Sequence, residues 1–305
     1  MAVAAQPDMV GRASGAKASS LLKTEAAKGY TLIAPPFLYA VLLLGLPIIV
    51  VLAHSFWTQN YLDIDRTFTL ENYRQALFEP IYQHLLVRSL VISFTVSVMT
   101  VMLAYPVAYF ISFHGGQHKH LWLFLITIPF WSSYLLRVMS WKVVLGYNGV
   151  LNTGLMGIGI IDEPSTALLY NSTAVLITLT HAWVAFAILP IFVSLEKVDR
   201  TLIEAATDLG DGPIRSFLRV TLPLSLPGVT AALLIVMIPT IGDYVTPKLV
   251  GGTDGVMISN IIEAQFKRAM NKPLGAALSV TTMIAVCAMA GATVLALRAA
   301  VRAFR

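Results

Sequence analysis

The chain has 305 residues, of which 57% are apolar and only 12% are charged. A soluble domain carries about 25% charged residues because its surface must be hydrated, so the composition argues against a soluble protein and favours an integral membrane protein. The net charge of +5 is scattered between apolar runs and forms no basic cluster, which argues against nucleic acid as a partner and favours membrane lipid.

Residues 1–30 are polar and rich in small side chains, which predicts a mobile cytoplasmic arm. Residues 31–305 are expected to form one transmembrane domain. Its first span, residues 32–56, carries no formal charge. This segment is long enough to cross a hydrocarbon core of ~30 Å.

Five further segments have the length and apolarity of a spanning helix of about 20 residues. Internal prolines such as Pro106 and Pro190 are tolerated there, because neighbouring helices or waters satisfy the freed carbonyl groups. The predicted fold class is therefore all-α, a polytopic membrane protein with about six transmembrane helices. The five segments are residues 90–110, 121–141, 174–194, 224–245 and 276–297.

The distribution of basic residues predicts the orientation in the membrane. With the N-terminus inside, the inner segments hold more Lys and Arg than the outer ones, which favours cytoplasmic N- and C-termini. The last outer loop is the exception, because it is rich in Lys and Arg. Its residues 258–267 are expected to form a helix at the membrane interface.

The inner loop between the fourth and fifth spans, residues 196–223, is more elaborate than a linker. Thr201 and Glu204 have the spacing of a capping box, and Gly210 is suited to end the helix that they begin. Residues 213–220 predict a second short helix that starts with a proline. The loop therefore indicates a docking element for a soluble partner, with an apolar stripe formed by Leu202, Ala206 and Leu209.

The spacing within this loop resembles the signature of permease subunits of binding-protein-dependent ABC importers. That family has Glu-Ala-Ala, three residues, Gly, nine residues, Ile, one residue and Leu-Pro; here Val220 replaces the Ile. The resemblance implies a type I importer permease fold, in which this loop contacts the ATP-hydrolysing subunit. The residues to which it assigns that coupling role are Glu204, Ala205, Ala206, Leu209, Gly210, Leu222 and Pro223.

The same resemblance implies the partners and the location of the chain. It implies two copies of an ATP-binding subunit, a second homologous permease subunit and an extracytoplasmic solute-binding protein. ATP and Mg would be bound by the ATPase subunit, so no cofactor or metal is expected in this chain. A bacterial cytoplasmic (inner) membrane is the expected location.

Two further stretches resemble the polyamine (spermidine/putrescine) branch of this family, and its first permease in particular. One stretch is residues 129–137 in the third span. The other is residues 242–252, followed by Gln265-Phe266 and residues 275–279. The resemblance implies a small organic solute, with a polyamine as the expected one.

Five residues in these stretches are candidates for lining the translocation path. An acid near the membrane is costly, so Asp243 either attracts a cationic solute or is a solvated or capping residue at the interface. Trp131 and Tyr134 offer cation–π contacts to such a solute, although ordinary helix packing is the favoured interpretation. Arg137 is expected to pair with an acid, with Asp243 as a possible partner, or to extend to the interface. Tyr244, beside Asp243, is the fifth candidate.

Several enzymatic functions are excluded by missing motifs. The sequence has no His-Glu-x-x-His of a zinc protease and no phosphate-binding loop, so this chain is not expected to be an enzyme by itself. No catalytic residue is proposed. A secondary transporter or channel for a small cation remains the alternative, but neither would explain the spacing of the inner loop.

Overall fold

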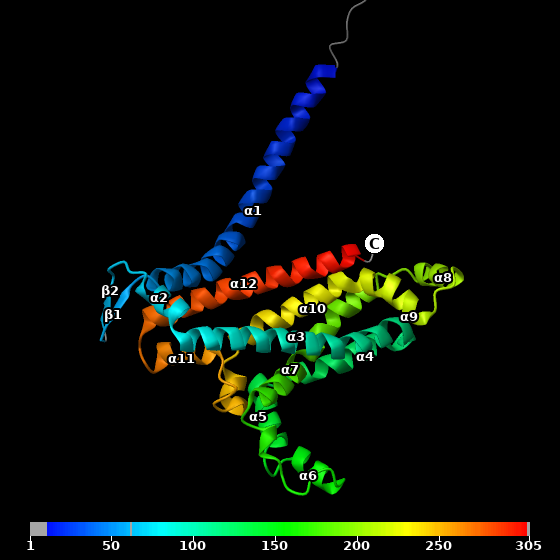
Figure 1. Ribbon diagram of the computed structural model, residues 1–305. Coiled ribbons are helices and arrows are strands. Elements are labelled where there is room, and N and C mark those ends of the chain that lie inside the picture. The colour runs from blue at the N-terminus through cyan, green and yellow to red at the C-terminus, as the bar shows by residue number, and fades with distance from the viewer. Residues whose placement is uncertain (1–10, 62, 304–305) are drawn as a thin grey trace, which may run out of the picture. The chain divides into compact units, whose positions relative to one another are not determined.

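The computed structural model describes residues 11–61 and 63–303, and these are almost wholly helical (Figure 1). The chain divides into two compact units, Met1–His54 and Ser55–Arg305. The first contains one long helix, α1 (Gly11–His54), whose apolar part Ala27–His54 is long enough to cross a membrane.

The described part of the predicted N-terminal arm is the helical start of α1, and the mobility of the arm stays a prediction. Residues 11–30 are helical, and residues 1–10 lie outside the described part of the chain. The reason is local composition, because this stretch is rich in Ala, Lys and Leu, which have high helix propensity. Of its three glycines, Gly11 begins the helix, and Gly15 and Gly29 inside it cost only about 1 kcal/mol each relative to Ala.

The second unit opens with a short antiparallel hairpin, β1 (Thr58–Asn60) and β2 (Asp63–Asp65), followed by helix α2 (Glu71–Phe78). The hairpin is joined to α2 by the buried Asn72. Its side-chain amide donates hydrogen bonds to the carbonyl oxygens of Ser55, at 3.0 Å, and Trp57, at 2.8 Å.

Three helices form the core of the second unit: α3 (Pro80–His114), α7 (Ser172–Leu195) and α10 (Leu222–Gly242). Their contact surfaces carry small residues and buried hydroxyl groups, as is usual for helices that pack inside a membrane. Ser93 of α3, for example, donates to the carbonyl oxygen of Met237 of α10 at 2.6 Å. Helix α12 (Lys272–Ala303) packs along α10 and α2.

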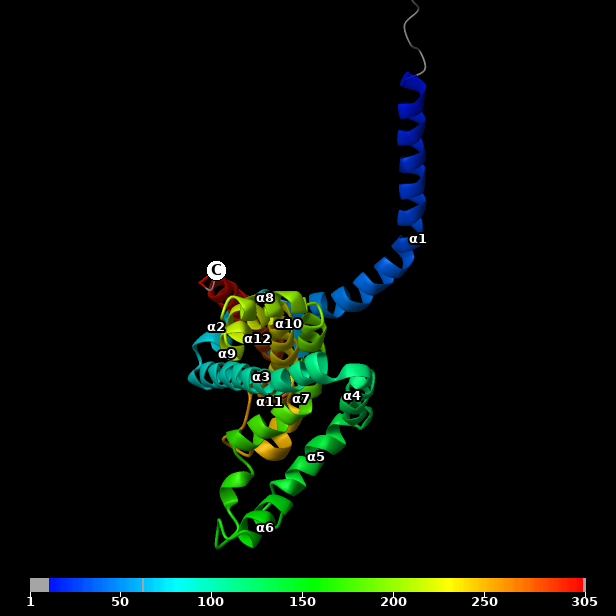
Figure 2. The same cartoon turned by 90° about the vertical axis from the view of Figure 1, so that its right-hand side faces the viewer.

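The third predicted span is broken. Helices α4 (Lys119–Thr127) and α5 (Tyr134–Val144) are separated by a 3₁₀ turn, Ile128–Trp131, and are bent by 86° (Figure 2). The prediction of one continuous helix over residues 121–141 is therefore wrong. Pro129 favours the tight turn, and the extended backbone of Ser132 ends it. Among the described residues, five helices are long enough to cross a membrane, or six if this pair is one span.

The remaining elements are short and connect the core helices. The predicted interface helix over residues 258–267 is confirmed as a helix with these bounds. The short elements are a 3₁₀ turn at Gly116–His118, α6 (Val150–Gly157), a 3₁₀ turn at Thr166–Leu168, α8 (Arg200–Asp208), α9 (Pro213–Ser216), π-helical turns at Phe217–Thr221 and Pro247–Gly251, and α11 (Ile258–Lys267).

Candidate functional site

The inner loop begins with helix α8, which is capped by a different residue from the one predicted. Asp199 is the N-cap, and its carboxylate accepts the backbone N–H of Thr201 at 3.0 Å. This hydrogen bond holds the pKa of Asp199 below its ordinary value. The predicted capping box of Thr201 and Glu204 is therefore wrong, because the earlier carboxylate satisfies the free N–H group.

The predicted apolar stripe of α8 is divided between the body of the protein and its surface. Ala206 is buried, whereas Leu202 is 48% exposed and Leu209 is 88% exposed. Ile214 of α9 is also exposed. Glu204 and Ala205 lie on the exposed side of the helix. The loop thus presents several apolar side chains at its surface, which is the usual sign of a contact site for a partner.

The turn between α8 and α9 depends on Gly210. Its φ angle of +91° lies in the left-handed region, which confirms the predicted helix terminator. An ion pair of 3.1 Å between Asp211 and Arg219 closes the turn.

The sequence predicted a separate second short helix that ends before the membrane segment, but the structure shows no such end. The helix continues through the π-helical turn Phe217–Thr221 into α10, so that Pro213–Gly242 is a single span candidate. Leu222 is the first residue of α10, and Pro223 lies in its first turn, where the missing N–H costs little. Both residues are half-buried.

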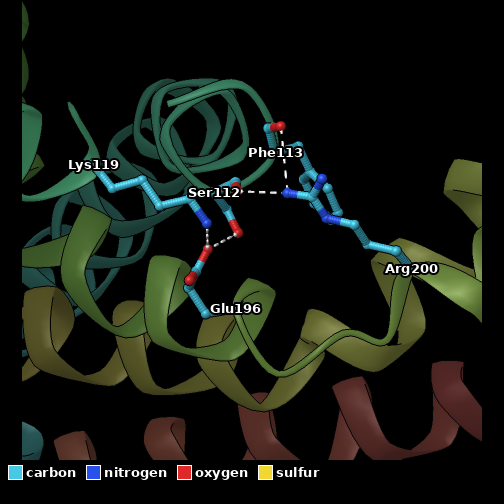
Figure 3. A network of polar contacts seen from close by, with 5 residues as sticks. All are labelled: Ser112, Phe113, Lys119, Glu196 and Arg200. Carbon is cyan, nitrogen blue, oxygen red and sulfur yellow. Dashed lines mark hydrogen bonds and ion pairs between the residues drawn. The ribbon is translucent and has the colours of Figure 1, made fainter. Parts of the chain in front are cut away.

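Polar contacts join the start of this loop to the ends of two other helices (Figure 3). Glu196, directly after α7, accepts hydrogen bonds on Oε1 from Lys119 at 2.6 Å and from Ser112 at 2.8 Å. Burial alone would raise the pKa of Glu196, but these two donors outweigh it and hold that pKa below its ordinary value. Arg200 lies at 3.4 Å from the carbonyl oxygen of Ser112 and 5.7 Å from the ring centre of Phe113.

At the other end of α10, Asp243 is held by a complete set of hydrogen bonds. Its Oδ1 accepts the backbone N–H groups of Val245, at 2.8 Å, and Thr246, at 3.2 Å. Its Oδ2 accepts the hydroxyl group of Tyr134, which also lies 2.7 Å from Thr246 Oγ1. Of the two interpretations of Asp243, these contacts favour the capping residue, because this carboxylate organises the backbone that follows α10.

The two terminal nitrogens of Arg137 bind main-chain carbonyl groups, whereas its buried Nε has no hydrogen-bond partner among the described residues. Its guanidinium donates to Pro129 O at 2.8 Å and Ala182 O at 3.1 Å, and it lies 5.6 Å from the ring centre of Phe130. Of the two alternatives for Arg137, the structure does not show a pair with an acid among the described residues, and the extension to the interface stays a prediction. The bend between α4 and α5 exposes carbonyl groups that an unbroken helix would have used itself.

Two cavities lie near this end of α10, and the five candidate path residues do not all line the same one. A cavity of about 370 Å³ is lined by Tyr134, Arg137 and Asp243, together with the aromatic rings of Phe130, Trp183 and Phe186. A larger cavity of about 590 Å³ is lined by Tyr244. Trp131 lines neither of them and is 82% exposed.

The sequence reasoning missed an acid in the larger cavity. Glu263 of α11 lies 3.3 Å from both Lys248 and Lys267. Burial alone would raise the pKa of Glu263, but these two ammonium groups hold it below its ordinary value. The spacing of four residues between Glu263 and Lys267 on a predicted helix was the signal that could have identified the pair.

Comparison with known proteins places this geometry in a family. Residues 37–303 match the family model described as binding-protein-dependent transport system inner membrane component. The spermidine/putrescine transport system permease protein PotB of Escherichia coli (strain K12) is 35% identical over 247 residues, which cover 81% of this chain and 89% of that protein. PotB of Haemophilus influenzae is 36% identical over 245 residues, which cover 80% and 85% respectively.

Solved structures share the fold at lower identity. A chain of a bacterial ABC transporter involved in the import of the acidic polysaccharide alginate aligns with a TM-score of 0.64 at 15% identity, covering 92% of this chain and 98% of that chain. This likeness concerns the fold alone. Together with the matches in sequence, it confirms the predicted all-α permease fold over the secondary transporter or channel. The chain belongs to the family of binding-protein-dependent transport system inner membrane components, and it is a multi-pass permease subunit of an ABC importer.

Proposed function

We propose that this chain, with a second homologous permease subunit, forms the path by which a polyamine such as putrescine or spermidine enters the cell. Two copies of a separate ATPase subunit would bind ATP and Mg, and an extracytoplasmic binding protein would deliver the solute. The observation that carries the polyamine assignment is the identity of 35% to PotB of Escherichia coli across 81% of this chain. A periplasmic protein accompanies the alginate transporter in a second solved structure of that system, which supports the binding-protein partner.

The proposed contact with the ATPase is the loop of residues 196–223. Its support is the exposure of apolar side chains on two short helices, with Leu209 88% and Ile214 73% exposed. A solvated linker would not present such residues, whereas a docking surface buries them on contact. With this loop inside and the bent pair of α4 and α5 counted as one span, both termini are cytoplasmic, in agreement with the excess of basic residues in the inner segments.

The proposed path passes the outer end of α10. The cavity of about 370 Å³ there offers several aromatic rings, which suit an aliphatic ammonium group, whereas its carboxylate, Asp243, is already engaged by Tyr134 and backbone N–H groups. Arg137 shares this cavity, so its charge opposes the accumulation of a polycation. We expect this arrangement to let a polyamine pass without holding it tightly.

Uptake by the assembled complex tests the proposal. The chain is purified with its partner subunits, reconstituted in liposomes that contain ATP and supplied with the binding protein and labelled putrescine or spermidine. ATP-dependent accumulation of either polyamine is the expected result. Accumulation of neither polyamine, by a complex that still hydrolyses ATP when the binding protein is added, would overturn the polyamine assignment.

A further inference from the structure

The start of the inner loop is fixed to two helices that it does not follow in sequence. One carboxylate oxygen of Glu196 accepts hydrogen bonds from two side chains. These are Lys119, the first residue of α4, and Ser112, in the last turn of α3. The Lys119 side chain is 22% exposed and that of Glu196 is 36% exposed. This pair is better shielded than the ion pair of Arg74 and Glu71, whose side chains are 71% and 46% exposed. We therefore expect the Lys119–Glu196 pair to be stronger than an ordinary surface ion pair.

Arg200 makes a second attachment to the same place. Its guanidinium donates to the carbonyl oxygens of Ser112, at 3.4 Å, and Phe113, at 3.5 Å. Carbonyl groups in the last turn of a helix lack partners within the helix, and a cation there is also favoured by the helix dipole. Figure 3 shows Glu196 and Arg200 reaching the end of α3 from either side of the chain that joins α7 to α8.

The far side of the loop is attached to α3 as well. Phe217, in the π-helical turn before α10, packs against the rings of Tyr105 and Tyr109 of α3, with centroid distances of 5.7 Å and 6.0 Å. Tyr105 also forms a hydrogen bond of 2.8 Å with Ser225 of α10. Both flanks of the loop therefore contact the final turns of α3, and the Glu196 side alone also holds α4.

Helix α4 leads directly to the candidate translocation path. The 3₁₀ turn after α4 supplies Pro129, whose carbonyl oxygen binds Arg137, and the next helix, α5, supplies Tyr134, which binds Asp243. A displacement of α8 would thus reach the cavity of about 370 Å³ through Glu196, Lys119 and α4, without passing along α10.

We propose that Glu196 is a positioning residue that transmits movement of the inner loop to α3 and α4 during transport. This inference rests on the proposed function, because it takes the loop to be the contact with the ATPase. In the assembled complex, Glu196 would not touch ATP or solute. Its role is to make the junction of α3 and α4 move together with α8, so that ATP hydrolysis stays coupled to opening of the path.

The test compares ATP consumption with transport in the complete complex. The Glu196→Gln and Lys119→Met variants remove one charge each and should raise the ATP hydrolysed per solute imported by about tenfold, the size of a typical coupling energy. The double exchange Glu196→Lys with Lys119→Glu restores the opposite charges and should bring this ratio back toward the parent value. Glu71→Gln is the matched control, because it breaks an exposed ion pair far from the loop in sequence, and it should leave the ratio unchanged.

The outcomes separate this inference from the proposed function. A parent-like ratio in Glu196→Gln, or the same loss in the double exchange as in the single variants, would overturn the role of Glu196. Failure of Glu196→Gln to retain the ATPase subunit during purification would also overturn it, because Glu196 would then serve docking. If the parent itself retains no ATPase, the proposed function fails instead.

Discussion

The two ends of α10 differ in how their side chains are contacted. At the inner end, the loop that precedes the helix leaves several apolar side chains exposed and is held to α3 from both flanks. At the outer end, both carboxylate oxygens of Asp243 accept hydrogen bonds from within the chain, from Tyr134 and from backbone N–H groups. We therefore propose that the inner end is completed by contact with another molecule, whereas the polar contacts of the outer end are completed within this chain.

This difference predicts different consequences of mutation. Changes at the surface of the inner loop should reduce transport while leaving the protein folded. Changes in the internal contacts of α10 should reduce stability first, and transport only as a result.

The largest effect on transport is expected at Gly210. Its φ of +91° disfavours any residue with a side chain, and Gly210→Trp also places a bulky group beside Leu209 on the docking surface. Import should fall by at least about tenfold, whereas the stability of the purified permease should fall only by the local backbone strain of about 1–2 kcal/mol. Gly212→Ala is the matched control, because Gly212 has an ordinary φ of −70° and space for a methyl group. Equal loss of import in both variants would contradict the account.

Stability should respond most strongly where α7 and α10 touch. A Cβ atom at Gly228 would lie 2.5 Å from the carbonyl oxygen of Pro190 and 2.4 Å from Ser194 Cβ. Gly228→Ala should therefore lower the stability by about 1–3 kcal/mol, as overpacking does. Thermal unfolding in detergent measures this, with Gly154→Ala as a control that meets no neighbour within 4 Å. An unchanged unfolding temperature in Gly228→Ala would show that the helices separate without cost.

A similar loss is expected at the outer end from Tyr134→Phe. The change removes a hydroxyl group that donates to the Asp243 carboxylate, and such a bond contributes about 1.5–3 kcal/mol. The unfolding temperature should fall, whereas Tyr147→Phe, at an exposed tyrosine, should leave it unchanged. If Tyr134→Phe instead abolished transport at parent stability, the hydroxyl group would be acting on the solute.

The smallest effect is a pH dependence at Glu196. Because its folded-state pKa lies below the ordinary value of 4.5, its ion pair stabilises the protein at higher pH. This contribution is lost as the pH falls through the lowered pKa of the folded state. The difference in unfolding temperature between the parent and Glu196→Gln should therefore be present at pH 7 and shrink below pH 4.5. A difference that stays constant with pH would show that the charge of Glu196 contributes nothing.

The sequence predicted the features that depend on composition over many residues. Long apolar runs identified the five unbroken helices of the described residues that are long enough to cross a membrane, because a membrane helix must be apolar over about 20 residues. Apolar composition does not determine whether the helix bends within such a run. The break after Thr127 therefore escaped prediction, although Pro129 was visible.

Local competition between residues explains the other errors. Asp199 and Thr201 are both good helix caps, and only the structure shows that Asp199 is used. The partners of Arg137 are backbone carbonyl groups, that of Pro129 at the bend and that of Ala182 in α7, so no pattern of side chains indicates them. The coupling residues could be named from the spacing of the family motif, whereas the contacts of Glu196 depend on how α3, α4 and α7 come together.

The most direct test of the central claim, that the inner loop is the ATPase contact, is a pull-down of the tagged chain from detergent-solubilised membranes. The parent is compared with a variant carrying Glu204→Lys and Gly210→Trp, and ATPase activity is measured in the eluate. We predict an active ATPase with the parent and none with the variant, at equal recovery of the permease. Recovery of the same ATPase activity with both would contradict the assignment of this loop.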